Sequence, residues 1–336
     1  MQAPEAASEP LTAPDLICSE GVPAPAEPRA IKLLPQGCRI LAVGEGDFTF
    51  TEALARAHQP LSPGSLVATC LDTEAELCAK YAGAAERLAT LRSLGAEVTC
   101  GVDARHLAEG PLAGVAPFDR VVFNFPLLPV TEIEARSGLY DVHLANRAML
   151  VEFLRSAPAV LRPDGIVAIA SKDCFPYSWW RVEAMPQWSG GELAFMGMLP
   201  WQYTEYPSLY SGPCNVNRDA SVKPTDAVIF VFARPGSSAF AAYSSSLVPE
   251  WNHNKGRVRL TPSIGQLQCE ICNVNGLAAV DLAQHEAGKI HRKRAALEKR
   301  WEACCLSSTG AHPPPRRPVM APRSPRPRPA LLLLTA

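Results

Sequence analysis

The stretch that decides the fold spans residues 40–50 and reads Ile-Leu-Ala-Val-Gly-Glu-Gly-Asp-Phe-Thr-Phe. Its first four residues are apolar and predict a buried strand. Gly44 and Gly46 allow a tight turn that lets the backbone approach a ligand, and a helix is expected to begin just after it. Thr49 occupies the position where a dinucleotide fingerprint has a third small residue, which favours a ligand without a pyrophosphate.

Working outward from this stretch, short apolar runs alternate with helix-compatible segments. One such segment, residues 74–94, places Leu77, Tyr81, Leu88 and Leu91 largely on one face and predicts a helix. Strands that alternate with helices form right-handed βαβ units, so the expected fold class is α/β, Rossmann-like, with a mainly parallel sheet and helices on both faces. The seven expected strands are 39–43, 66–71, 97–101, 120–125, 166–171, 193–198 and 227–233.

Ligands of such sheets bind beyond the carboxyl ends of the strands. The turn of Gly44, Glu45, Gly46, Asp47 and Phe48 follows the first expected strand, and Asp72 follows the second. A carboxylate at Asp72 can accept hydrogen bonds from the hydroxyl groups of an adenosine ribose; its alternative role is a helix N-cap before Thr73.

The next two strand ends complete the candidate site. Asp103 can accept a hydrogen bond from an adenine amino group, or it can simply cap residues 104–108. Asn124-Phe125-Pro126 offers an amide that both donates and accepts, beside an aromatic ring and a stiff proline. The four strand ends together favour an adenosyl cofactor and a flat base.

Several of these segments resemble the ribosomal-RNA uridine-N3 methyltransferase-like family, a branch of the Rossmann-like methyltransferases. The resemblance covers about residues 37–234. It implies a seven-stranded sheet with one antiparallel strand near its edge, S-adenosylmethionine as methyl donor and ribosomal RNA or a pre-ribosomal particle as partner. Gly44, Gly46 and Asp72 would line the cofactor, and residues 124–126 would face the base. The segments that carry it are 40–50, 68–72, 101–104, 118–126 and 161–165, with Lys172, Pro176, Tyr177 and Trp180.

The chemistry asks mainly for positioning, because a sulfonium methyl is already activated and needs in-line approach. The candidates for orienting or stabilising the base are Asn124, Phe125, Pro126 and Lys172, although Lys172 is also a plausible surface or phosphate-contacting lysine. The family usually continues after Asn-Phe-Pro with His and small residues, whereas this chain has Leu127-Leu128-Pro129. The leading interpretation is an S-adenosylmethionine-dependent RNA methyltransferase that forms N3-methyluridine in ribosomal RNA. The departure keeps the alternative open, a non-catalytic RNA-binding factor of ribosome assembly. A small-molecule methyltransferase would leave the C-terminal region without a role.

An aromatic-rich stretch can stack an extruded base or pack against the sheet, and packing is the favoured interpretation for most of its members. These are Tyr177, Trp179, Trp180, Trp188, Trp201, Tyr203, Tyr206 and Tyr210.

Cys269, Cys272, His285 and His291 have the spacing C-x2-C-x12-H-x5-H, which predicts a tetrahedral zinc site. The segment is similar to matrin/U1-like zinc fingers, a family whose members often bind RNA. Downstream, Arg292, Lys293, Arg294, Lys299 and Arg300 are expected to continue a helix and contact phosphates, without DNA specificity; protein binding is the competing role. The finger is expected to act as a tether that raises local substrate concentration.

Charge is distributed unevenly. From His285 to the end there are eleven Lys or Arg against three Glu, and the net charge of the whole chain is −1, so the preceding residues carry about −9. We expect an acidic domain at 37–234, a linker at 236–262, the finger with its basic helix at 265–302, and disordered tails at 1–30 and 307–336.

The segments outside these domains predict where the protein works. The eleven cysteines lack a disulfide pattern, no secretory signal follows Met1, and the run at 331–334 is much shorter than the about 20 apolar residues of a membrane span. Reduced thiols in an intracellular compartment are therefore expected. Nuclear or nucleolar residence, with the cytoplasm as alternative, is what the family resemblance and the basic segment 292–294 imply. The sequence does not indicate an oligomeric state.

Overall fold

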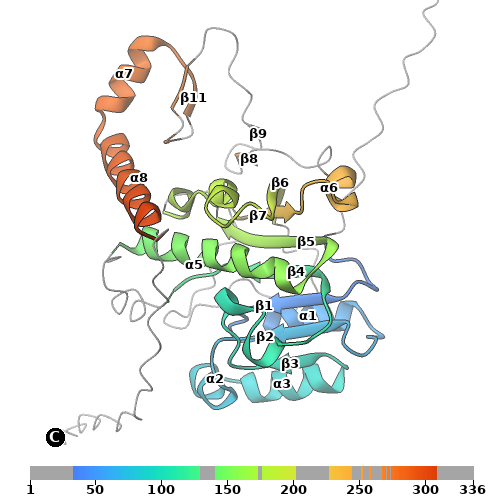
Figure 1. Cartoon of the computed structure of the whole chain (residues 1–336). Helices are drawn as coiled ribbons and strands as arrows, with labels where there is room; N and C mark the ends of the chain where they lie inside the picture. The colour runs from blue at the N-terminus through green and yellow to red at the C-terminus, as the bar shows by residue number, and fades with distance from the viewer. Residues whose placement is uncertain are drawn as a thin grey trace, which may run out of the picture.

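The computed structural model describes residues 33–128, 141–172, 176–201, 227–243, 251–252, 257–258, 267–269, 271–272 and 274–308. Their main feature is a seven-stranded sheet in the order β3-β2-β1-β4-β5-β7-β6 (Figure 1). β1 to β5 run parallel, and β7 lies antiparallel to both β5 and β6. The strands are β1 (Ile40–Val43), β2 (Leu66–Thr69), β3 (Glu97–Thr99), β4 (Phe118–Asn124), β5 (Leu161–Lys172), β6 (Ala194–Pro200) and β7 (Ala227–Ala233).

The expected α/β fold is thus confirmed, including all seven strands and the single antiparallel strand next to the edge. The helices are α1 (Thr49–Ala57), α2 (Glu74–Lys80), α3 (Ala84–Ser93), α5 (Val142–Ser156), α6 (Ser238–Tyr243), α7 (Ala279–Ala287) and α8 (Lys289–Ser308). No described helix has the length and apolarity to cross a bilayer. Short 3-10 helices are η1 (Ala104–His106), η2 (Gly110–Leu112), η3 (Ala157–Val160), η4 (Tyr177–Trp180) and η5 (Val182–Gln187).

The single helix expected over 74–94 is wrong, because the chain breaks it into α2 and α3. Tyr81 leaves the helical conformation, with φ −122° and ψ 116°, and Gly83 adopts φ +76°. Leu77, Leu88 and Leu91 are nevertheless buried in one cluster. The apolar spacing predicted the buried side chains correctly, but it did not reveal the glycine turn between the helices.

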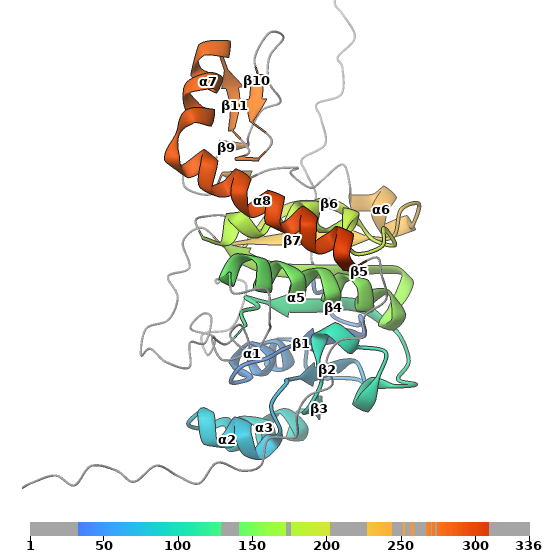
Figure 2. The same ribbon diagram turned by 60° about the vertical axis from the view of Figure 1, so that its left-hand side comes forward.

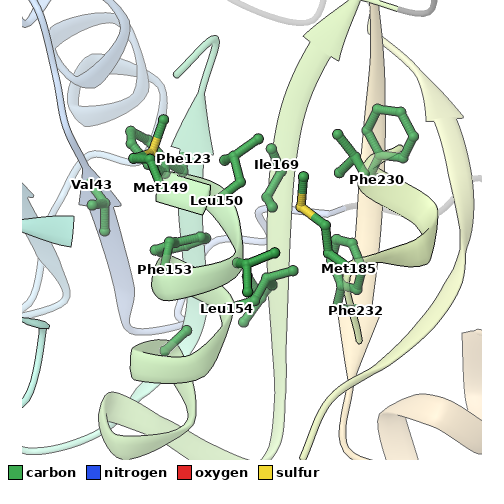
Figure 3. Packing of buried hydrophobic residues seen from close by; sticks show 14 of the residues in the cluster. Val43, Phe123, Met149, Leu150, Phe153, Leu154, Ile169, Met185, Phe230 and Phe232 are labelled. Atoms are coloured by element: carbon green, nitrogen blue, oxygen red, sulfur yellow. The ribbon is translucent and has the colours of Figure 1, made fainter. Parts of the chain in front are cut away.

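Two apolar layers sandwich the sheet. α1 and α3 cover one face, packing with β-strand residues such as Ile40, Ala68 and Val122. α5 covers the other face, where Phe153 packs edge-on against Phe123 at a centroid distance of 5.0 Å. Figure 3 shows Met149, Leu150, Phe153 and Leu154 of this helix pointing at β4, β5 and β7. The helices on both faces leave the strand ends as the polar edge of the domain.

Two small hairpins lie toward the C-terminus. β8 (Trp251–Asn252) pairs with β9 (Arg257–Val258), and β10 (Leu267–Cys269) pairs with β11 (Val274–Leu277). α7 and α8 follow the second hairpin, and α8 crosses the outside of α5 (Figure 2).

Candidate functional site

The turn after β1 is held tightly against the sheet. Gly44 has φ +65°, and a Cβ placed there would lie 2.4 Å from Cε2 of Phe123. Glu45 follows in the turn, and its backbone N–H donates to the carbonyl of Thr69 on β2 at 2.8 Å. Only glycine therefore fits at position 44. Because the turn lies so close to β4, its backbone rather than a side chain faces the carboxyl ends of the strands.

Glu45 is the buried acid of this turn. Its carboxylate accepts a hydrogen bond from the backbone N–H of Thr51, at 3.3 Å, in the first turn of α1. Burial raises the pKa of Glu45 to about 7, and the hydrogen bond only partly opposes this effect.

Gly46, Asp47 and Phe48 lead into α1. Gly46 is half-buried in the turn, and the Asp47 carboxylate accepts hydrogen bonds from the backbone N–H and the hydroxyl of Thr49 at 3.1 and 2.6 Å. Arg87 of α3 donates to the Asp47 carbonyl at 2.6 Å. Phe48 adopts φ +64° and buries its whole ring in the core, so only its backbone lies at the turn.

Asp72 lies directly beyond β2. The alternative role as a helix cap is wrong, because Thr73 is the N-cap of α2 and forms a reciprocal capping box with Glu76. The Asp72 carboxylate is partly exposed and pairs with the ammonium group of Lys80. The Asp72 carboxylate therefore lies at the end of β2 and does not cap α2.

Asp103 does serve its alternative role. Its carboxylate caps η1 by accepting from the backbone N–H of Arg105 at 3.0 Å, and it also accepts from the Arg105 guanidinium at 2.8 Å. Burial opposes ionisation of Asp103, but the hydrogen bonds from Arg105 outweigh it and lower the pKa.

The end of β4 carries a buried amide. The Oδ1 and Nδ2 atoms of Asn124 are both buried, and neither has a hydrogen-bond partner among the described residues. Buried polar atoms are normally paired, so this amide is a candidate for binding a partner that the described residues do not supply. Phe125, the next residue, has φ +48°, an uncommon conformation for a non-glycine residue that clusters at functional sites.

The residues that follow this amide, Phe125 and Pro126, are held in place by hydrogen bonding and packing. The Phe125 backbone N–H donates to Ala170 of β5 at 2.8 Å, and its ring packs edge-on against Trp201 at 5.1 Å. Pro126 is buried behind it. Lys172 ends β5, two residues beyond Ala170, which is the register partner of Asn124. The period of two in strands places Lys172 on the same face of the sheet as Asn124.

A residue that sequence analysis missed, Asn146 of α5, fixes the segment after Pro126. It is fully buried; its Oδ1 accepts from the Leu128 N–H at 2.9 Å and its Nδ2 donates to the Val142 carbonyl at 2.8 Å. The available signal was an amide inside the apolar pattern of 144–154. Leu127, beside it, is 59% exposed.

The aromatic residues mostly pack, as expected. Trp179, Trp180 and Trp201 are buried, and Tyr177 and Trp188 are half-buried against the core. Pro129, Tyr203, Tyr206 and Tyr210 lie outside the described residues, as do the expected tail at 1–30 and most of the linker at 236–262. Of the tail expected at 307–336, residues 307 and 308 end α8 and the rest lies outside the described residues.

The four predicted metal ligands come together. One ligand atom from each of Cys269, Cys272, His285 and His291 lies within 4.8 Å of every other. Nδ1 of His291 is 3.4 and 3.6 Å from the two sulfurs and 3.3 Å from Nε2 of His285. Bond lengths of about 2.3 Å to sulfur and about 2.05 Å to nitrogen around a tetrahedral ion give separations of roughly 3.5 and 3.3 Å. The geometry of the four ligands therefore fits a tetrahedral ion.

The expectation that Arg292, Lys293, Arg294, Lys299 and Arg300 contact phosphates is wrong for Arg294, which is buried and donates to the carbonyl of Ser178 at 3.0 Å. Arg300 pairs with Asp141 at 3.1 Å, and its side chain remains 51% exposed. Arg292, Lys293 and Lys299 are exposed as well. Four of the five residues therefore still present positive charge to solvent.

Comparison with known proteins identifies a family. The sequence model described as "BMT5-like: rRNA (uridine-N3-)-methyltransferase BTM5-like" matches residues 41–211, just over half of the chain. It includes the strand-end residues from Gly44 to Lys172.

Two relatives from Arabidopsis thaliana match about the same share of the chain. Heavy metal-associated isoprenylated plant protein 41 is 37% identical over 169 residues, which are 50% of this chain and 32% of that protein. An uncharacterized protein is 31% identical over 175 residues, 50% of this chain and 78% of its own length. The chain thus spans about a third of the first relative.

Among solved structures, Aeropyrum pernix fibrillarin, crystallised with natively bound S-adenosyl-L-methionine, has a TM-score of 0.36 and 15% identity. The match covers 60% of this chain and 68% of that one.

Proposed function

The chain belongs to the BMT5-like family, and from that premise we propose that it transfers a methyl group from S-adenosylmethionine to N3 of a uridine in ribosomal RNA. The observation that supports this most is the unpartnered, buried amide of Asn124 at the end of β4. Uracil presents an N–H donor beside a carbonyl acceptor, and an amide is complementary to that pair because it accepts with Oδ1 and donates with Nδ2.

The cofactor side would be formed by the first three strand ends. Gly44 and its turn provide backbone that approaches closely, and Asp72 provides a carboxylate for the ribose hydroxyls. Asp103 already accepts four hydrogen bonds from Arg105, so an amino group would bind there only by sharing an acceptor oxygen or displacing one of them. Gly46, which lacks a side chain, would leave space in the turn for the cofactor. Glu45, Asp47 and Phe48 would hold the turn in its conformation.

The base side would be formed by β4 and β5. S-adenosylmethionine, when bound, supplies a methyl group on a sulfonium that needs in-line approach and no further activation. Asn124 would orient the base edge, and Phe125 and Pro126 would form the wall behind it. Lys172, on the same face, would stabilise the negative charge on the uracil oxygens when the N3 proton passes to solvent water and N3 takes the methyl group from the sulfonium.

We propose zinc as the ion at Cys269, Cys272, His285 and His291, because two thiolates and two imidazoles in a tetrahedral arrangement are a structural zinc set. The exposed Arg292, Lys293 and Lys299 would then contact RNA phosphates.

A second function is favoured by one feature. Leu127 is exposed directly beside the candidate base site, where the family usually has a histidine. A chain that had lost transfer would still bind RNA as a ribosome-assembly factor, and turnover separates the two functions.

The test is transfer of label from tritiated S-adenosylmethionine to total ribosomal RNA by the zinc-loaded protein, followed by nucleoside analysis. Asp72→Asn is the site variant and Lys80→Ala its control, since the latter removes the ion pair but keeps the carboxylate. We expect N3-methyluridine from the wild type and from Lys80→Ala, and none from Asp72→Asn. Absence of N3-methyluridine with all three proteins, with RNA binding intact, would overturn the proposal in favour of the assembly factor.

A further inference from the structure

The helix that carries the last metal ligand is buried along one side. His291 lies in the first turn of α8, and further along the helix Leu297 and Trp301 are each 5% exposed within the apolar cluster that contains α5. Trp301 packs edge-on against Trp188 at a centroid distance of 5.3 Å. In Figure 2, α8 lies across α5 rather than projecting into solvent. The helix is thus built into the large domain.

A buried ion pair fixes this docking. Glu298 accepts hydrogen bonds from Arg147 of α5 with both carboxylate oxygens, at 2.6 and 2.9 Å, and from Arg181 at 3.1 Å. The Arg147 side chain has no exposed surface, and its guanidinium lies 5.1 to 5.2 Å from the ring centroids of Trp301 and Trp188. A bidentate pair in such a setting specifies one position of the helix, because any other would strand a buried charge.

A second arginine, Arg294, connects the metal cluster to η4. The Arg294 guanidinium donates to the carbonyl of Ser178 at 3.0 Å and to the carbonyl of the ligand Cys272 at 3.5 Å. Arg147 donates to the next carbonyl of η4, that of Trp179, at 2.6 Å. Two adjacent carbonyls of η4 therefore accept hydrogen bonds from arginines. Arg294 lies on α8 itself, and Arg147 lies on α5 and pairs with Glu298 of α8. η4 begins five residues after Lys172.

We propose that the Cys/His cluster and α8 are a positioning element of the large domain, in which Arg294 and Glu298 convey the order of the metal site to η4. An ion at the cluster fixes the Cys272 loop, the loop fixes Arg294, and Arg294 fixes the Ser178 carbonyl. This positioning role adds to the expected role of the finger as a tether that raises local substrate concentration. The part of this proposal that concerns RNA rests on the proposed function; the physical coupling does not.

The test is amide hydrogen exchange by mass spectrometry on the full chain. Five samples are compared: the zinc-loaded wild type, the wild type after chelation, and zinc-loaded Arg294→Gln, Arg294→Lys and Glu302→Gln. Glu302 is an exposed glutamate on the same helix and serves as the matched control. Peptides from α3, on the opposite face of the sheet, report whether the fold is intact.

Chelation is expected to speed exchange at least about tenfold both in α8 and in residues 177–187, with α3 unchanged. Arg294→Gln should reproduce the change at 177–187 while the protein retains its zinc, Arg294→Lys should restore part of the protection, and Glu302→Gln should match the wild type. Affinity for S-adenosylmethionine should stay the same in Arg294→Gln, while transfer to RNA falls. Faster exchange confined to 267–291 after chelation, with 177–187 unchanged, would overturn the coupling whatever the catalytic result. If Arg294→Gln also speeds exchange in α3, its fold is disturbed, and the comparison of the chelated with the zinc-loaded wild type then decides whether the coupling exists.

Discussion

The strand-end turns and the docked C-terminal helix use polar groups in opposite ways. At the strand ends, Asn124 has a buried amide without a partner among the described residues, and Phe125 has a strained backbone. Across α8, Glu298 meets two arginines and uses both of its oxygens. Unpaired groups and strain reduce stability and prepare a site for a ligand, whereas paired groups fix one arrangement. The contrast assigns chemistry to the first region and positioning to the second.

The largest effect is expected at the metal cluster. Cys269→Ser with Cys272→Ser removes both thiolates and should abolish metal retention, since zinc supplies about 10–16 kcal/mol of binding free energy in comparable small modules. Metal content of the purified protein by mass spectrometry measures this. Cys78→Ser, an exposed cysteine outside the cluster, is the control and should retain the metal. Full metal retention without the two thiolates would contradict the assignment.

Glu298→Ala comes next. It leaves the fully buried Arg147 without its counter-charge and should lower the free energy of unfolding by about 3–5 kcal/mol, as measured by urea denaturation. Glu302→Ala on the exposed side of α8 should change it by less than about 0.5 kcal/mol. Equal effects of the two substitutions would mean that the helix is not docked in solution.

Asn124→Leu separates function from stability. It should reduce methyl transfer by about 100- to 1000-fold, as loss of a positioned hydrogen-bonding group does. Yet it should leave the free energy of unfolding equal or higher, because no protein hydrogen bond is lost. Asn146→Leu is the matched control: it strands the Leu128 N–H and should cost about 1–3 kcal/mol. Destabilisation by Asn124→Leu of the same size would show that its amide has partners within the chain.

Gly44→Ala should destabilise by about 1–3 kcal/mol through contact with Phe123, in addition to the strain of its positive φ. Gly101→Ala has φ +74° and no atom within 4 Å of the added Cβ, so it carries only the strain. The difference between the two melting transitions isolates the contact. No difference would mean that the turn does not press on β4.

A further effect concerns pH. Glu45 has a pKa raised to about 7 in the folded protein, so the folded state binds more protons than the unfolded state between about pH 4.5 and 7. Stability should therefore fall as pH rises through this window, by at most about 1.4 kcal/mol per pH unit. Glu45→Gln should flatten this part of the profile of unfolding free energy against pH. An unchanged slope would show that the carboxyl is solvated.

The two regions also differ in how far the sequence predicts them. Apolar runs and the turn at Gly44 predicted every strand of the sheet, and the cysteine and histidine spacing predicted the cluster of four ligands, because both depend on local periodicity. Asp103 shows the limit of sequence analysis. Its role as a cap was one of two predicted roles, but the hydrogen bonds from the Arg105 guanidinium that fix its carboxylate were not predicted.

The docking of α8 was out of reach of sequence analysis. Glu298 and Arg147 are 151 positions apart, and on an otherwise basic helix Arg294 reads as one more phosphate contact. Only the packing of Leu297 and Trp301 on α5 turns that side of the helix inward. Likewise, Asn146 became meaningful once Leu128 was brought against it.

The most direct test of this division is hydrogen exchange of the full chain with and without S-adenosylmethionine. Protection is predicted in peptides that contain Gly44 to Phe48, Asp72 and Asp103, with α8 and its contacts on α5 unchanged. Protection confined to α8 or the metal cluster, or none at a cofactor concentration that supports transfer, would contradict the assignment of chemistry to the strand ends.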